Sequence, residues 1–132
     1  VWSPEPQAAS KSGASTIAEV VEFDHEIFAG QSNLTSFVIP ANTHLLAVTG
    51  RVRTGIVGSA LSGWRLGVEG ADDRYGAGIG VSFNSYVLGM SGYPVTYYED
   101  TPLKITAEGG NFGSGAVRLC AHLVTVRPPA PF

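Results

Sequence analysis

The feature that most constrains the fold is a period-two alternation of apolar and polar residues in short stretches separated by glycine or proline. The clearest stretch is 117–123, where apolar residues at odd positions alternate with Arg, Cys and His at even positions. Successive side chains of a β-strand point to opposite faces of a sheet, so this alternation is typical of half-buried strands. No segment shows the 3.6-residue period of an amphipathic helix. We therefore predict an all-β protein.

The pattern predicts eight or nine short strands joined by turns. By residue range, these strands are 19–28, 34–39, 45–54, 64–68, 79–83, 86–90, 93–98, 103–107 and 117–123. The glycine-rich segment 55–63 is interpreted as a turn and the polar segment 70–76 as a loop. Strands and turns at this spacing predict an antiparallel β-sandwich of the jelly-roll kind. Four aromatic residues are expected in its core: Phe23, Phe37, Trp64 and Phe83.

Three segments are expected along the 132 residues. Residues 1–18 are rich in Pro, Ser, Ala and Gly and predict an extended arm or linker, in which Trp2 is expected to dock on this domain or on a neighbour. Residues 19–127 are expected to form the β-sandwich domain, and 128–132 a Pro-rich tail. The first residues lack the basic start and apolar core of a signal peptide, so we expect synthesis in the cytoplasm. The sequence does not begin with Met, so we also expect a fragment of a longer protein.

Composition argues against several classes of partner. Charged residues make up only 14% of the chain, against about a quarter in an average protein. The net charge of -3 and the scattered Lys and Arg residues are unlike the basic stripe of a nucleic-acid-binding protein. No apolar run approaches the roughly 20 residues that span a bilayer. We expect neither nucleic acid nor membrane insertion, and a surface suited to work outside the cell or to packing against copies of itself.

Residues that carry chemistry are sparse. The three histidines have no metal-ligand spacing, and Cys120 lies in an apolar strand, where a buried inert thiol is expected. The paired carboxylates 72–73 and 99–100 are read as solvated turn residues, with the Asp100 side chain bonding nearby backbone. They are also the only support for a third alternative, a depolymerase with two catalytic carboxyls. We predict no catalytic residue, no metal and no cofactor.

One small group of residues suits a polar ligand. Asp72, Asp73, Arg74 and Tyr75 place hydrogen-bonding groups beside an aromatic ring in one expected loop. Adjacent tyrosines 97 and 98 must point to opposite faces of a strand, so one of them is expected to be exposed. A tyrosine ring suits both sugar stacking and a subunit interface. The predicted ligand-binding residues are therefore Asp72, Asp73, Arg74, Tyr75 and Tyr98, with an ordinary exposed loop as the alternative.

About two thirds of the chain resembles the C-terminal domain of fibre or head-spike proteins from alphaproteobacterial phages and gene transfer agents. The stretches that carry the resemblance are 37–42 (FVIPAN), 44–52 (HLLAVTGRV), 64–68 (WRLGV), 73–80 (DRYGAGIG), 97–112 (YYEDTPLKITAEGGNF) and 117–119 (VRL). The resemblance implies a place on the surface of a virion or virus-like particle, extracellular after release. It brings no catalytic motif, so no active-site residue is carried over.

The resemblance and the residues together predict a carbohydrate-binding adhesion domain. It would attach the particle to bacterial surface (capsular) polysaccharide, and other copies of itself and other spike or capsid proteins would be its protein partners. A homo-oligomer is expected, because several copies raise the strength of weak sugar binding. The alternative is a structural, oligomerising or capsid-decoration domain, in which exposed tyrosines serve subunit contacts.

Overall fold

The computed structural model describes residues 8–131, except for the side chains of 91–94. Within this range there are nine strands and no helix. Their bounds are β1 (Ala8–Ala9), β2 (Ser15–Ile27), β3 (Ser32–Ile39), β4 (Thr43–Ser59), β5 (Gly63–Val68), β6 (Ala71–Ile79), β7 (Tyr86–Tyr97), β8 (Thr101–Glu108) and β9 (Asn111–Arg127). The prediction of an all-β protein is confirmed.

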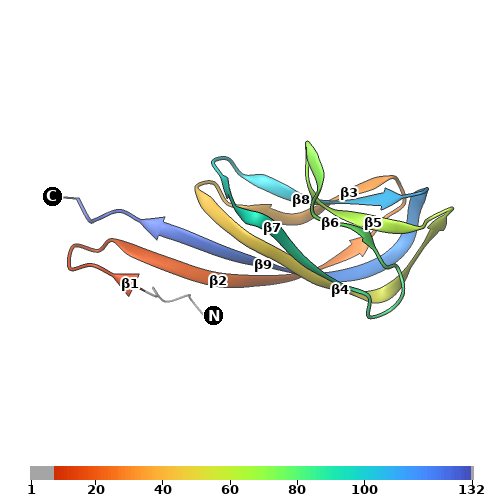
Figure 1. Ribbon diagram of the computed structural model, residues 1–132, viewed down its shortest axis with the longest axis horizontal. Coiled ribbons are helices and arrows are strands. Elements are labelled where there is room, and N and C mark those ends of the chain that lie inside the picture. Colours follow the sequence, from red (N-terminus) through yellow and green to blue (C-terminus); the bar gives the residue numbers. More distant parts are fainter. Residues whose placement is uncertain (1–7, 132) are drawn as a thin grey trace.

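The strands form two sheets that pack face to face (Figure 1). One sheet has the order β1-β2-β9-β4-β7 and the other β3-β8-β5-β6, and every pair is antiparallel. Strands far apart in sequence are therefore neighbours, as β2 and β9 are along the whole of β2. From β2 onward, consecutive strands alternate between the two sheets, except that β5 and β6 are neighbours in the same sheet, and this order is that of a jelly roll. The jelly-roll prediction is confirmed.

The core lies between the sheets and is made of the inward positions of the alternating strands. Val117, Leu119 and Ala121 of β9 are fully buried, as the sequence pattern predicts. The facing sheet contributes Trp64, Leu66, Leu103 and Ile105, also fully buried. Phe23 and Phe37 stack with ring centroids 5.1 Å apart and pack against this core from its side.

Two neighbouring predictions are wrong around β6. The segment 70–76 is not a loop, because Ala71–Ile79 forms the edge strand β6, paired with β5. Its polar side chains are compatible with a strand because an edge strand exposes one side to water. The predicted strand 79–83 is a loop after Ile79, and Phe83 is 66% exposed rather than buried.

Other strands differ in length or phase from the prediction. β4 continues to Ser59 through the glycine-rich segment, and β7 is one strand where two were predicted. The alternation in 45–54 predicts Leu45 and Ala47 inward and leaves Val48 open. A register shift between Leu45 and Ala47 moves the inward position to Val48, which is fully buried, whereas Ala47 is not. Such a β-bulge inserts one extra residue into a strand and so reverses the alternation beyond it.

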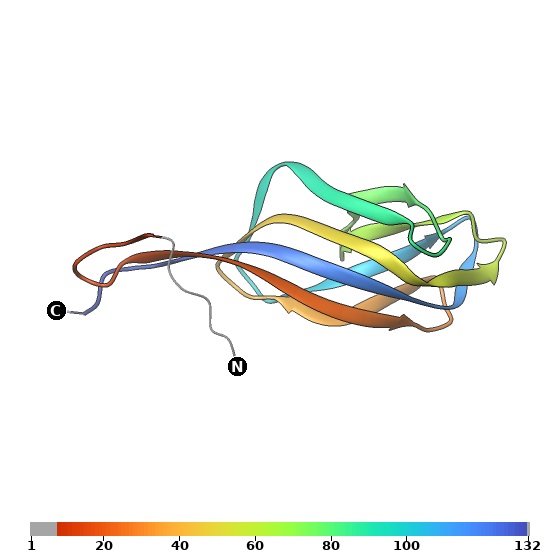
Figure 2. The same ribbon diagram turned by 90° about the horizontal axis from the view of Figure 1, so that it is seen from below.

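A narrow ribbon projects from one end of the sandwich (Figures 1 and 2). It consists of β1, the start of β2 and the end of β9, since β4 pairs with β9 only from Val124 inward. β2 thus begins at Ser15, inside the segment predicted as an arm. Trp2 lies outside the described residues.

Candidate functional site

The predicted ligand-binding residues Arg74 and Tyr75 belong to a hydrogen-bonded chain that joins β6 to β7. The hydroxyls of Tyr75 and Tyr97 are 2.7 Å apart, and Arg74 Nη1 donates to the Tyr97 hydroxyl over 3.0 Å. Tyr75 is only 2% exposed, and this burial, with the hydrogen bond between its hydroxyl and that of Tyr97, raises its pKa. The Tyr75 ring therefore lies in the core and presents no open face to a ligand.

The other predicted ligand-binding residues are more exposed and take no part in these hydrogen bonds between β6 and β7. Asp72 is 3.7 Å from Arg65 Nη1, and Asp73 is exposed. Tyr98 is 76% exposed whereas Tyr97 is 7% exposed, which confirms that the adjacent tyrosines point to opposite faces. The hollows described below are lined by other residues, so sugar binding at these five positions stays a prediction.

The structure gives Asp100, His25 and Cys120 surroundings that can be compared with the sequence-based predictions for them. Asp100 accepts a hydrogen bond from the Ala41 amide at 2.8 Å, so it joins two loops rather than bonding nearby backbone. His25 bonds to Asn33 Oδ1 at 3.0 Å in the core, which gives it the structural role expected of a strand histidine. Cys120 is partly exposed rather than buried, although partial burial still raises the pKa of its thiol.

β7 carries a row of exposed apolar side chains that the sequence pattern did not predict as an interaction surface. Tyr86, Leu88 and Met90 occupy successive outward positions and are 60%, 69% and 74% exposed. We call these three residues the β7 row. They lie on the outer face of the β2-β9-β4-β7 sheet, opposite Arg51, Thr49 and Ala47 of β4. Monomeric proteins rarely leave contiguous apolar side chains so open, which makes this face the strongest candidate for an interaction surface.

A charged cluster lies on the same outer face, toward its β2 side. Asp24 accepts two hydrogen bonds from Arg118, at 2.7 and 3.1 Å, and one from Arg53 at 3.0 Å. The hydrogen bonds from Arg118 lower the pKa of Asp24. The Asp24 carboxylate is therefore shared by two arginines, which leaves one positive charge in excess.

Two shallow hollows indent the same face. One, of about 320 Å³, lies between the charged cluster and the β7 row and is lined by Glu22, Thr49, Gly50, Arg51, Tyr86, Val87, Leu88, Arg118 and Cys120. The other, of about 410 Å³, is lined by Ala18, Glu19, Val20, Leu46, His122 and Leu123. Thr49 and His122, which line different hollows, are hydrogen-bonded at 2.9 Å. Open, mainly apolar hollows of this kind can receive side chains of a partner.

The loop before β7 is held firmly against the sandwich. Hydrogen bonds of 2.8 to 2.9 Å fix the backbone of this loop at both ends and in its middle. They run from Trp64 Nε1 to Gly80 O, Ile56 N to Val81 O, Asn84 N to Val52 O, Val52 N to Ser85 O and Arg51 Nη1 to Asn84 O. Arg51 also lies over the Tyr86 ring, 5.3 Å from its centroid. The exposed Phe83 side chain thus projects from a fixed loop backbone just before β7.

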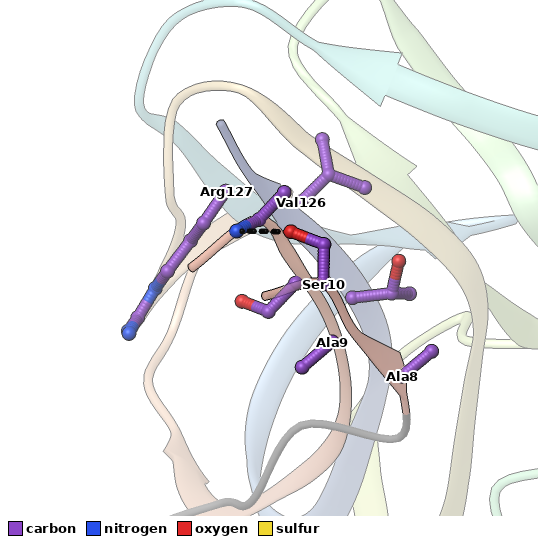
Figure 3. A pocket seen from close by; sticks show the side chains of 8 residues that line it. Ala8, Ala9, Ser10, Val126 and Arg127 are labelled. Atoms are coloured by element: carbon purple, nitrogen blue, oxygen red, sulfur yellow. Dashed lines mark hydrogen bonds between the residues drawn. The ribbon is translucent and has the colours of Figure 1, made fainter. Parts of the chain in front are cut away.

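A third hollow, of about 350 Å³, lies in the projecting ribbon (Figure 3). Small side chains line it: Ala8, Ala9, Ser10, Ala14, Ser15 and Thr16, with Val126 and Arg127 from β9. Ala14 N donates to Ser10 Oγ over 3.1 Å at the hairpin turn, and Ala130 N donates to Ser12 O. The segment after β9 therefore holds the turn between β1 and β2 in place, which stiffens the ribbon.

Metal-binding and membrane-spanning features do not emerge within residues 8–131. No three His, Cys, Asp or Glu side chains of this part gather as metal ligands would. Nor does this part contain a helix with the length and apolar character needed to cross a bilayer.

Comparison with known proteins identifies the fold. No protein-family model and no curated protein matches the chain. A chain in the capsid asymmetric unit of cyanophage Pam1 is similar in structure, with a TM-score of 0.59 and 17% identity, over 92% of this chain and 94% of that one. A chain in the capsid of the Helicobacter pylori bacteriophage KHP30 aligns with a TM-score of 0.47 and 10% identity, over 87% of this chain and 98% of that one. The first comparison shows that this chain shares its whole fold with a capsid component of similar length.

Proposed function

We propose that this protein is a non-catalytic structural subunit on the surface of a phage-like particle. The observation that carries the proposal is the end-to-end likeness to a chain from the cyanophage Pam1 capsid asymmetric unit. Coverage of more than nine tenths of both chains means that the likeness extends over nearly the whole of each chain. The role would be to join other copies and other capsid proteins on the virion.

The surface of the molecule suits such a role. The outer face of the β2-β9-β4-β7 sheet combines the β7 row with two open hollows. The projecting ribbon extends the reach of the subunit beyond its own sandwich (Figure 2). Low overall charge, at 14% of residues, reduces the cost of removing water from large areas, because charged groups are the most expensive to desolvate.

Binding to particles that lack the chain tests this role. Purified chain is added to such particles, and the mixture is sedimented at increasing chain concentration. We expect saturable co-sedimentation at a fixed ratio of chain to major capsid subunit. Absence of co-sedimentation, with a folded chain that binds host cells instead, would contradict a structural role.

A second candidate is the adhesion role, attachment of the particle to bacterial surface polysaccharide. The specific observation in its favour is Tyr98, an aromatic ring left 76% exposed immediately after β7. Exposed Asp73 and Arg74 are the polar groups that would accompany it. A Tyr98→Ala variant separates the two roles, because it should abolish binding to host cells that carry polysaccharide and leave co-sedimentation with particles unchanged.

A further inference from the structure

The two long border strands of the five-stranded sheet differ sharply in charge. β7 ends the sheet on one side, and none of its twelve residues is Asp, Glu, Lys or Arg. On the other side β2, which only the two-residue β1 flanks, carries four acidic residues. Charges on border strands are a common protection against unwanted strand association. The β2 border has this protection and the β7 border lacks it.

The missing protection coincides with the exposed apolar side chains of the β7 row. Tyr86, Leu88 and Met90 are each 60% or more exposed, on a strand whose described residues pair only with β4. An uncharged, apolar row of this kind at the border of a sheet is expected to be covered in the working assembly.

The backbone beneath the row is rigid. A Cβ at Gly89, between Leu88 and Met90, would lie 2.1 Å from Val48 O and 2.6 Å from Tyr75 O. β7 is therefore packed closely between β4 and β6, which fixes the backbone from which its outward side chains project. A surface that is ordered before binding loses little conformational entropy when a partner covers it.

We infer that the β7 row is the contact between two copies of this chain, packed antiparallel about a two-fold axis near Leu88. The row is complementary to itself, which argues for a second copy as the occupant. Two-fold packing about Leu88 places Leu88 against its own copy and Tyr86 against Met90, and β7 carries no charge that the same strand of a second copy would repel. Contact through the acidic β2 border would instead place like charges together.

The nearest charged side chain beside the row does not oppose this arrangement. Arg51 lies opposite Tyr86, two residues along from Leu88. Antiparallel packing about Leu88 places the two Arg51 side chains four residues apart along the strands, or about 13 Å at the usual rise per residue. That separation exceeds the screening length of roughly 8 Å at physiological salt. The two-fold arrangement therefore brings apolar groups together without pairing like charges.

This inference rests on the proposed structural role, but its test needs no particle, so either can fail without the other. Sedimentation velocity of the free chain over a concentration series measures self-association. We expect dimers of the parent chain, and an increase of at least about tenfold in the dissociation constant for Leu88→Lys. Val20→Lys is the matched control: Val20 is 58% exposed on the same sheet face but on β2, and its variant should associate as the parent does.

Mixing variants tests the two-fold geometry. Leu88→Lys and Leu88→Glu should each remain monomeric alone and form a mixed dimer together, because opposite charges then meet at the axis. A crosslink gives a reading that does not depend on the stability of these variants. In a Cys120→Ala background, Leu88→Cys should oxidise to a covalent dimer and Val20→Cys should not.

Several results would overturn the inference. The parent chain would stay monomeric at all concentrations, or Val20→Lys would lose as much association as Leu88→Lys. The mixture of Leu88→Lys and Leu88→Glu would fail to associate, or cysteines at positions 20 and 88 would crosslink equally. Any one of these results is sufficient.

Discussion

At the residue scale, the bond between Tyr75 and Tyr97 links the two sheets at their β6–β7 border. Tyr75→Phe removes one buried hydroxyl while keeping the ring, so we expect a loss of about 1 kcal/mol of unfolding free energy. Urea denaturation measures it. Tyr98→Phe is the control, because Tyr98 is exposed and its variant should unfold as the parent does. Equal losses in the two variants would show that the Tyr75–Tyr97 bond is not the cause.

A second residue-scale prediction concerns pH. The pKa of Asp24 is lowered, chiefly by its hydrogen bonds with Arg118. A carboxyl with a lowered folded-state pKa stabilises the fold above its unfolded-state pKa, about 4, and loses that contribution as pH falls through the folded-state value. Asp24→Asn should therefore melt below the parent chain at pH 7, with the difference shrinking below about pH 4. Melting curves at several pH values would contradict this if the difference were constant.

At the element scale, close packing of β7 depends on one missing side chain. Gly89→Ala would push its new Cβ into backbone oxygens of β4 and β6, and such overpacking costs about 2 kcal/mol of unfolding free energy. Gly55→Ala, on β4, is the control, because its Cβ would find only Val81 O, at 4.0 Å. Chemical denaturation of the two variants should separate them clearly. If both unfold at the denaturant concentration of the parent, β7 is not packed closely between β4 and β6 as described.

The projecting ribbon gives a second prediction at this scale. β1 pairs with β2 at only two positions, so a chain that begins at Ser15 should lose less than about 1 kcal/mol of unfolding free energy, within the range of surface changes. If the ribbon contacts neighbouring subunits, the same deletion should weaken co-sedimentation with particles about tenfold, or about 1.4 kcal/mol. Unchanged co-sedimentation would exclude the hairpin from the contact.

Also at the element scale, the alternation of apolar and polar residues predicted the strands well where one face of the strand is buried and the other is exposed to water. The inward and outward positions of β9 and of the second half of β2 follow the pattern directly. The pattern failed at β6, where the strand lies at a border and carries mostly polar residues and glycines. It also failed at the bulge after Leu45, since an inserted residue leaves no signal in composition.

The candidate surface was harder to predict than the strands. Tyr86, Leu88 and Met90 occupy alternate positions of the strand and so share one face. Val87, between them, is apolar too, so the local pattern does not indicate which face of the strand is exposed to water. Only the folded structure, in which this side of β7 faces away from the other sheet, shows that the row is uncovered. The predicted loop 72–75 was selected for its side-chain chemistry, and pairing of β6 with β5 could not be inferred from it.

At the scale of the whole molecule, the proposed role places this jelly roll on the shell of a phage-like particle. Electron cryo-microscopy of particles purified from the strain that encodes the chain would show whether it lies there. We expect density for a two-sheet sandwich with a projecting ribbon, repeated over the shell with its symmetry and contacting neighbouring subunits. Density for this fold only at the tip of a fibre, with none on the shell, would contradict it.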